Sequence, residues 1–506
     1  MQTKKEIHQA DFSKVAKNAG ITGFGDIFQY GFRYITNIII TRFLGSASFG
    51  IFVLSYAFLN ISQVISSLGL NQVVLRYISF YQGKDDNSRI KGTILTGSKI
   101  VFISSIIFSI IIFFMANFIA LNIFHKPEAE TPIKIMILAL PFLAIKKIFL
   151  SMLQGFHSIK YQIYIEKILQ PFIWLVFLVC FLFLGWGING LIGSLAVSII
   201  FGVIFALYYL LKIWGHDKRN VEPVFENEQL IKYSLPLLFS GLLGQIITWA
   251  VVFLLGRFRS VSEVGIYESG VRVAALIIFP LTAFNNIFSP MISELHSQNA
   301  WDRIESLFKV VTKWIFTLSF PIFLLLLIFA KPIMNIFGKD FVLGAPVLII
   351  IGLGQLINAG TGSVGYVLTM TGHQNIVLLN SIILCIINII LGLFLIPDSG
   401  IIGAAISACF SISFVNVLRL IEVYYFLKIH PYKLNFWKSL TAGIISAGIY
   451  YWLINNFIYK ITIIYLILFS SLFIITYVFL IYLFKLDEED KYVLERLMGK
   501  LKFTKK

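Results

Sequence analysis

The side chains of this sequence that could do chemistry are polar and ionisable groups that recur inside long apolar segments. Four of them share one face of the first segment, at successive intervals of four, three and four residues: Asp26, Tyr30, Arg33 and Asn37. An ionisable group at bilayer depth costs about 2.5–3.5 kcal/mol on insertion scales, so it normally faces a bundle interior or a cavity. The spacing therefore predicts a polar helix face turned towards a cavity.

Later apolar segments carry similar side chains, and we expect them to face the same cavity. The residues predicted to bind a ligand there are Asp26, Tyr30, Arg33, Tyr56, Asn60, Gln63, Lys146, Glu268, Arg272, Gln355 and Asn358. No metal site is predicted, because the three cysteines have no partner at a metal-type spacing.

Two of these pairs have competing explanations. Glu268 and Arg272 are about 6 Å apart along a helix axis, so a mutual ion pair explains them as well as ligand contact does. Asp26 and Arg33 are about 10.5 Å apart in helical rise, too far for an easy direct pair. Each is therefore expected to need a partner from another helix or from a ligand.

The elements that must position these residues are predicted to be membrane-spanning helices. Hydrophobic residues make up 58% of the 506 residues and charged ones only 13%, against about 25% charged in soluble domains. At roughly 20 residues for each span, the apolar stretch between Gly20 and Phe484 has room for about fourteen helices. The predicted fold is therefore an all-α polytopic membrane protein.

The positive charge of +16 indicates orientation in the membrane and not nucleic-acid binding. Most of the 41 Lys and Arg residues fall on one side of the predicted membrane, which places both termini in the cytoplasm. Lys146 and Lys147, several residues inside the cytoplasmic end of the fourth span, could extend to the interface. Lys218 and Arg303 are expected to be cytoplasmic, and the expected external residues are His125, Arg259 and Lys339.

Two matching pairs of segments indicate an internal repeat. FLGSASFGIF at 43–52 resembles FRSVSEVGIY at 258–267, and GLIGSLAVS at 190–198 resembles GIIGAAISA at 400–408. The separation along the chain between the two members of each pair corresponds to about six spans. An even number of spans returns the chain to the same side of the membrane, so the repeats are parallel. The predicted parts are a first six-helix lobe (1–211), a cytoplasmic linker (212–231), a second six-helix lobe (232–426), two additional helices (437–484) and a cytoplasmic tail (485–506).

Catalysis is not expected. The sequence has no P-loop for ATP, and the longest predicted outer loop, near 117–132, carries few ionisable groups. No cofactor is predicted, and a coupling ion is left open.

Several segments resemble the polysaccharide-exporter branch of the multidrug/oligosaccharidyl-lipid/polysaccharide superfamily, the Wzx-type O-antigen and capsule flippases. They are ITRFLGSASFGIF at 40–52, SLGLNQVVLRYIS at 67–79, SPMISELHSQNAWDRIESLF at 289–308 and IFGKDFVLGAPVLIIIGLGQLINAGTGSVGYVLTMTGHQN at 336–375. The resemblance implies two six-helix lobes around a central cavity and alternating-access transport of an isoprenoid-diphosphate-linked oligosaccharide. It carries over only a general role for cationic cavity residues, onto Arg33 and Arg272.

Cationic donors suit a lipid diphosphate, and the polar and aromatic groups suit its sugars. The expected partners are the lipid-linked oligosaccharide and membrane lipids, with other polysaccharide assembly proteins left open. Three rivals remain: a lipid II flippase, a drug/cation antiporter of the same superfamily, and a membrane glycan polymerase or ligase. An antiporter should favour net negative cavity carboxylates, whereas here Asp26 and Glu268 are matched or outnumbered by Arg and Lys.

Overall fold

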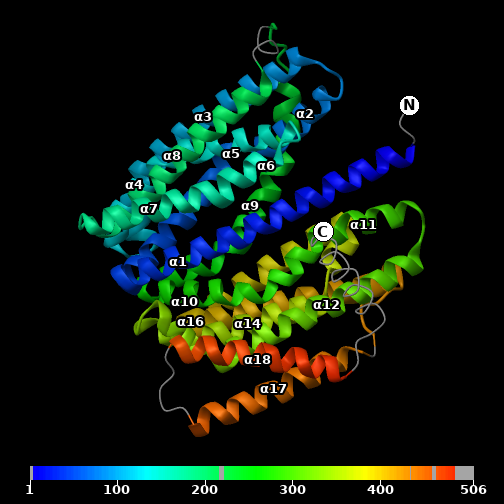
Figure 1. Ribbon diagram of the computed structural model, residues 1–506. Helices are drawn as coiled ribbons and strands as arrows, with labels where there is room; N and C mark the ends of the chain where they lie inside the picture. Colours follow the sequence, from blue (N-terminus) through cyan, green and yellow to red (C-terminus); the bar gives the residue numbers. More distant parts are fainter. Residues whose placement is uncertain (1–3, 216–220, 434, 458–462, 485–506) are drawn as a thin grey trace, which may run out of the picture. The chain divides into compact units, whose positions relative to one another are not determined.

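The computed structural model describes residues 4–215, 221–433, 435–457 and 463–484. Within these residues every regular element is helical and none is a strand, which confirms the all-α prediction. Figure 1 shows the helices in chain order. Lys218 and the predicted tail from 485 onwards lie outside the described residues.

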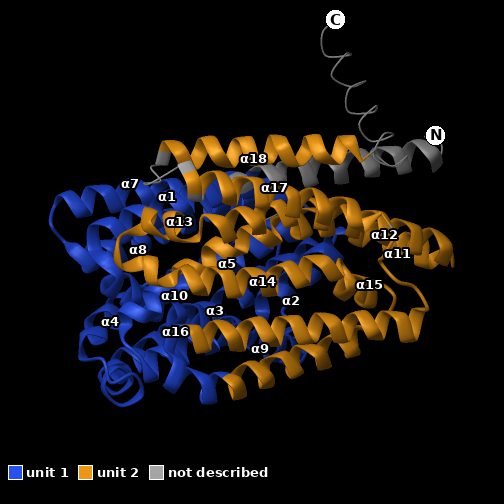
Figure 2. Ribbon diagram, turned by 90° about the horizontal axis from the view of Figure 1, so that it is seen from below, with its two compact units in different colours: residues 1–268, 392–401 blue, residues 269–391, 402–506 orange. Residues whose placement is uncertain are grey.

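The chain divides into two compact units, coloured in Figure 2. Unit 1 comprises Met1–Glu268 and Gly392–Ile401, and unit 2 comprises Ser269–Leu391 and Ile402–Lys506. The elements of unit 1 are α1 (Lys4–Ser67), α2 (Leu70–Gln82), α3 (Asn87–Phe118), η1 (Ile119–Ile123), η2 (Pro127–Ala129), α4 (Glu130–Leu138), α5 (Leu140–Gly155), α6 (Ile159–Ile163), η3 (Tyr164–Leu169), α7 (Gln170–Phe183), α8 (Gly187–Trp214), α9 (Asn227–Phe258) and most of α10 (Val261–Ala274). Those of unit 2 are η5 (Ala275–Ile278), α11 (Phe279–Ser297), α12 (Trp301–Ile328), α13 (Ala330–Phe337), η6 (Asp340–Gly344), α14 (Ala345–Thr361), α15 (Val364–Met370), most of α16 (Gln374–Leu427), α17 (Phe436–Phe457) and α18 (Ile463–Leu483).

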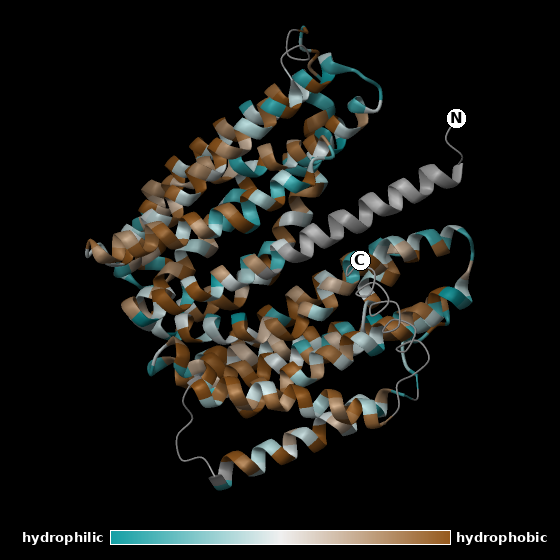
Figure 3. Cartoon of the chain, viewed as in Figure 1, coloured by the Kyte–Doolittle hydropathy of each residue, from teal (hydrophilic) through white to brown (hydrophobic). Residues whose placement is uncertain are grey.

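The described part of the chain contains 10 helices long and apolar enough to cross a membrane, or up to 11 if the pair bent by 41° at Ala139 is one span. Hydrophobic residues predominate along these helices in Figure 3, and hydrophilic residues gather near helix ends and turns. The chain is therefore a multi-pass membrane protein, and the expected count of fourteen spans stays a prediction.

Two of the elements are each a pair of helices joined at a glycine. A straight helix of 64 residues, the length of α1, would extend for about 96 Å, roughly three times the hydrocarbon thickness. Gly45 interrupts α1 with φ 77° and ψ −179°, and Gly400 interrupts α16 with φ 55° and ψ −130°. A side chain would be strained at these positive φ angles, so glycine is what permits each break.

Apolar side chains form a core within each unit. In unit 1, α2, α3, α5 and α8 contribute a cluster that includes Val74, Ile94, Ile148 and Leu210. In unit 2, α11, α12, α14, α15 and the end of α16 contribute a cluster with Phe288, Phe308, Ala359, Val367 and Val423.

A close crossing joins α1 to α10 inside unit 1. A Cβ atom on Gly50 would lie 1.7 Å from the carbonyl oxygen of Val261, and one on Gly265 would lie 2.4 Å from the carbonyl oxygen of Ser46. The aligned repeat segments pair Gly50 with Gly265 and Ser46 with Val261. Gly50 therefore approaches Val261, and the counterpart of Gly50, Gly265, approaches the counterpart of Val261, Ser46. Such reciprocal contacts are what a two-fold relation produces.

The boundary between the units falls inside α10, whereas the repeats place a linker at 212–231. Helix α9 belongs to unit 1 because it packs against α1 and α2. Its lead-in residues, from Val221, are also bonded to α3, since the Val224 amide donates to the Ser88 carbonyl at 3.1 Å and Lys91 Nζ donates to the Val221 carbonyl at 2.8 Å. The six-helix lobes inferred from the repeats stay a prediction.

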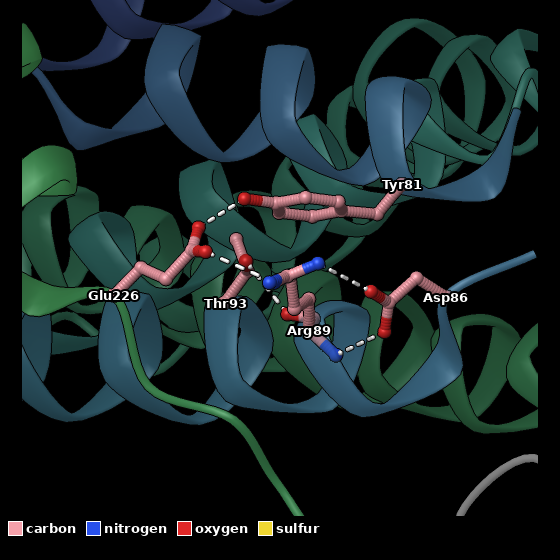
Figure 4. Close-up of polar contacts among 5 residues, drawn as sticks. All are labelled: Tyr81, Asp86, Arg89, Thr93 and Glu226. Carbon is pink, nitrogen blue, oxygen red and sulfur yellow. Dashed lines mark hydrogen bonds and ion pairs between the residues drawn. The ribbon is translucent and has the colours of Figure 1, made fainter. Parts of the chain in front are cut away.

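A carboxylate at the start of α9 completes this attachment (Figure 4). Glu226 accepts a hydrogen bond from the Tyr81 hydroxyl and forms an ion pair with Arg89 Nε at 3.0 Å. Arg89 also forms an ion pair with Asp86 at 2.9 Å. Burial, and after it the hydrogen bond to Glu226, raises the pKa of Tyr81 above its ordinary value. We call Tyr81, Asp86, Arg89 and Glu226 the α9 clasp.

Candidate functional site

A network of charged side chains lies inside unit 1, where α1, α5 and the η3 segment meet. Helix η3 is a π-helix that leads directly into α7, whose second residue is Pro171. Proline has no amide hydrogen to donate to the carbonyl four residues earlier, which is that of Lys167, so the regular α-helical pattern is interrupted here. This wider turn carries two adjacent charged residues, Glu166 and Lys167.

Lys167 pairs with the first of the predicted site residues. Its Nζ lies 2.5 Å from Asp26 Oδ1, and the two residues are far apart in the chain. Gly25 permits the contact, because a Cβ atom there would lie 2.6 Å from Ile163 Cγ2 and so would force α1 away from α6. Asp26 thus has a partner from another helix, which is one of the two kinds of partner that its distance from Arg33 predicts.

Glu166 pairs with α5. Lys147 Nζ lies 2.8 Å from Glu166 Oε1, and the neighbouring Lys146 donates to Gln170 Oε1 at 2.6 Å. Lys146 is only 2% exposed, and its aliphatic stem lies against Gly202 of α8, where a Cβ atom would come within 2.8 Å of Lys146 Cδ. Lys146 is therefore held inside unit 1 and does not extend to an interface.

These contacts define a polar network of three lysines and two carboxylates in unit 1. Its ionisable members are Asp26, Lys146, Lys147, Glu166 and Lys167. Lys147 and Lys167 each have a carboxylate partner, whereas Lys146 donates to the amide oxygen of Gln170. Ammonium groups donate charge-assisted hydrogen bonds to phosphate oxygens, so an anion is the ligand that the network suits.

Arg33 lies two turns beyond Asp26 on α1 and is exposed. Among the described residues it forms no ion pair or hydrogen bond. Tyr30, one turn nearer to Asp26, is 38% exposed. Arg33 is therefore a cation within an apolar segment that is available to a ligand.

The predicted residues further along α1 form an aromatic and amide group. Tyr56 stacks on Phe52 with ring centroids 5.8 Å apart and meets the edge of Trp249 at 6.0 Å. Asn60 donates from Nδ2 to the Tyr56 carbonyl at 2.7 Å. Gln63 is buried, and its Nε2 has no hydrogen-bond partner among the described residues. Aromatic faces and amide groups of this kind suit sugar rings, and contact with sugars stays a prediction.

The remaining predicted residues lie on α10 and α14. Glu268 is buried and Arg272 is half-buried, one helical turn apart on α10. In unit 2, Asn358 Nδ2 donates to Gln355 Oε1 at 3.4 Å. The structure thus joins Asp26 and Lys146 to one network in unit 1, joins Tyr56 to Asn60, and joins Gln355 to Asn358.

Sequence reasoning missed Glu166, Lys167 and Gln170 as members of the network. A signal was present, because Gln162, Glu166 and Gln170 recur every four residues and would share a helix face. Gln162 Nε2 does donate to Glu166 Oε2, at 3.4 Å. Lys167 lies 141 residues from Asp26 in the chain, and their pairing depends on how two helices pack.

Comparison with known proteins gives two family matches. Residues 15–296, more than half of the chain, match a family model described as Polysaccharide biosynthesis protein. Residues 236–394 match a second model, described as MatE.

Similar proteins cover most of the chain. The probable low-salt glycan biosynthesis flippase Agl15 of Haloferax volcanii is 26% identical over 440 residues, which cover 84% of this chain and 86% of the relative. Stage V sporulation protein B of Bacillus subtilis is 20% identical over 448 residues, with coverage of 82% and 85%. The lipid II flippase MurJ, in an inward closed conformation, superposes with a TM-score of 0.73 over 92% of this chain and 98% of its own, at 14% identity. At that identity the likeness shows the fold alone.

Proposed function

Because the chain belongs to the polysaccharide biosynthesis protein family, we propose that it moves an isoprenoid-diphosphate-linked oligosaccharide across the cytoplasmic membrane by alternating access. The relative named as a glycan biosynthesis flippase, similar over 84% of the chain, supports this assignment. The cargo would be a polysaccharide repeat unit carried from the inner to the outer face.

The observation that carries the proposal is the excess of cationic groups in unit 1. Lys146, Lys147 and Lys167 outnumber Asp26 and Glu166 by one residue, and Arg33 adds an exposed cation without a partner among the described residues. A diphosphate supplies a negative partner for Arg33, while the Tyr56 group offers aromatic and amide contacts for sugars. Lipid II, another lipid-linked diphosphate glycan, fits the same chemistry and stays an alternative cargo.

Drug or cation antiport is the second candidate, because residues 236–394 match the MatE model. A cationic drug would need a net negative site, and in the network of unit 1 each carboxylate is already paired with a lysine. Glycan polymerisation or ligation is the weaker alternative, since the Haloferax volcanii relative that covers 84% of the chain is named as a flippase. We propose a transporter without catalytic activity of its own.

A reconstituted flipping assay tests the proposal. The purified full chain in liposomes that carry a fluorescent isoprenoid-diphosphate oligosaccharide should make the inner-leaflet glycan accessible to an impermeant glycosidase added outside. Protein-free liposomes and a fluorescent cationic dye are the controls. Dye transport without glycan transport would favour antiport, and a change in glycan mass before the glycosidase is added would identify an enzyme.

We further propose that the protein lies in the cytoplasmic membrane with both termini in the cytoplasm, because lysine and arginine predominate in the segments assigned to that side. Single cysteines at positions 218 and 303 should react with an impermeant thiol reagent only after cells are opened. Cysteines at 125, 259 and 339 should react in intact cells. Labelling of 218 and 259 from the same side would contradict this orientation.

A further inference from the structure

A pocket of about 820 Å³ lies in unit 1 between α3 and the start of α9, and none of its lining residues belongs to the polar network. Helix α3 contributes most of its wall, and the residues around the α9 N-terminus contribute the rest. The lining residues are Leu95, Thr96, Lys99, Ile100, Ile103, Ser104, Ile107, Phe225, Asn227 and Ile231.

The wall of this α3–α9 pocket is mainly apolar and open. Ile103 is 45% exposed, Ile107 50%, Phe225 54% and Ile231 47%. From Leu95 to Ile107 the pocket follows about 18 Å of helix, close to the roughly 15 Å thickness of one hydrocarbon leaflet. Its length and lining therefore fit one hydrocarbon chain of a membrane lipid.

The same wall carries a cation. Lys99 is exposed, and among the described residues it forms no ion pair or hydrogen bond. The nearby cations at the start of α3 are already engaged, Arg89 with Glu226 and Lys91 with the Val221 carbonyl. A lysine in an apolar wall extends its ammonium towards the headgroup region, where phosphate is the available anion.

The pocket is held open by the protein itself. Phe225 lies between Val224, whose amide bonds to Ser88, and Glu226 of the α9 clasp. Thr96 donates to Asn227 Oδ1 at 2.8 Å, which ties the two walls together. A ligand would therefore meet a wall that is already ordered, which lowers the entropy cost of binding.

We propose that the α3–α9 pocket binds one anionic phospholipid of the cytoplasmic leaflet, with its phosphate at Lys99 and one acyl chain along α3. Both helices begin at the predicted cytoplasmic side. The headgroup of a lipid in the cytoplasmic leaflet would therefore lie at the end of the pocket that carries Lys99. Phosphatidylglycerol fits both features, whereas a zwitterionic lipid of equal chain length supplies no net charge for Lys99. This site is separate from the polar network of unit 1, so the proposal does not depend on the transported cargo.

Native mass spectrometry of the full chain tests the proposal, with equimolar phosphatidylglycerol and phosphatidylcholine of identical acyl chains added in detergent. The wild type should retain phosphatidylglycerol preferentially. Lys99→Gln should lower that preference by about fivefold, and Lys99→Arg should keep it. Ile103→Trp, which fills the groove, should reduce bound lipid of both kinds.

Lys160→Gln is the matched control, because Lys160 is an exposed lysine of unit 1 outside the pocket. It should leave the preference unchanged, and all variants should unfold at the wild-type temperature. Equal losses in Lys99→Gln and Lys160→Gln would overturn the proposal, since general surface charge would then explain the preference. Displacement of phosphatidylglycerol by an isoprenoid diphosphate in a Lys99-dependent manner would also overturn it and assign the pocket to the carrier lipid.

Discussion

Replacing Arg33 by alanine is expected to lower export of the lipid-linked glycan by about a hundredfold or more while the protein still reaches the membrane. Arg33 is exposed on α1 and has no partner among the described residues, so no internal ion pair is lost. Asp26 remains paired with Lys167 at 2.5 Å, so the variant leaves no uncompensated carboxylate there. The measurement is surface glycan in a strain that depends on this chain, normalised to membrane abundance.

Two further variants separate a substrate role from a structural one. Arg33→Lys should retain partial export, because a point charge loses the bidentate phosphate contacts of a guanidinium. Arg42→Ala, which removes another exposed arginine of α1, should export normally. Full export by Arg33→Ala at wild-type abundance would refute contact between Arg33 and the diphosphate. A fall in abundance without loss of export for each molecule would make Arg33 structural.

Replacing Gly50 by alanine is expected to remove most of the folded protein from the membrane. The added Cβ would lie 1.7 Å from the Val261 carbonyl oxygen, so α1 and α10 would have to separate. A backbone carbonyl cannot move aside as the end of a flexible side chain does. The loss in the free energy of unfolding should therefore exceed the 1–3 kcal/mol usual for overpacking, at about 3 kcal/mol or more. Detergent-solubilised protein should show a lost or broadened monodisperse peak in size-exclusion chromatography.

Gly244→Ala is the matched control, because a Cβ atom on this α9 glycine would meet nothing within 4 Å. Alanine in place of an unrestricted helical glycine is expected to raise stability by about 0.5–1 kcal/mol. Gly265→Ala should reproduce the Gly50 defect, since its Cβ would approach the Ser46 carbonyl oxygen to 2.4 Å. Normal yield and unfolding temperature for Gly50→Ala would show that the crossing is looser than the structure indicates.

The sequence alone determined the helical, membrane-spanning class and the presence of polar helix faces. Span length and hydropathy follow from bilayer thickness, and the faces follow from helical periodicity, so both can be read along the chain. The repeat also picked out Gly50 and Gly265 as equivalent positions. It did not indicate that these two glycines meet each other.

Only the tertiary structure decided which charges compensate one another. Periodicity places Asp26 on a face but does not name Lys167, 141 residues away, as its partner. The assignment of α9 to unit 1 likewise depends on its packing against α1 and α2, with Glu226 reaching Tyr81 across 145 residues. Such contacts arise from the packing of one helix against another, and the pattern along a single helix carries no information about its neighbour.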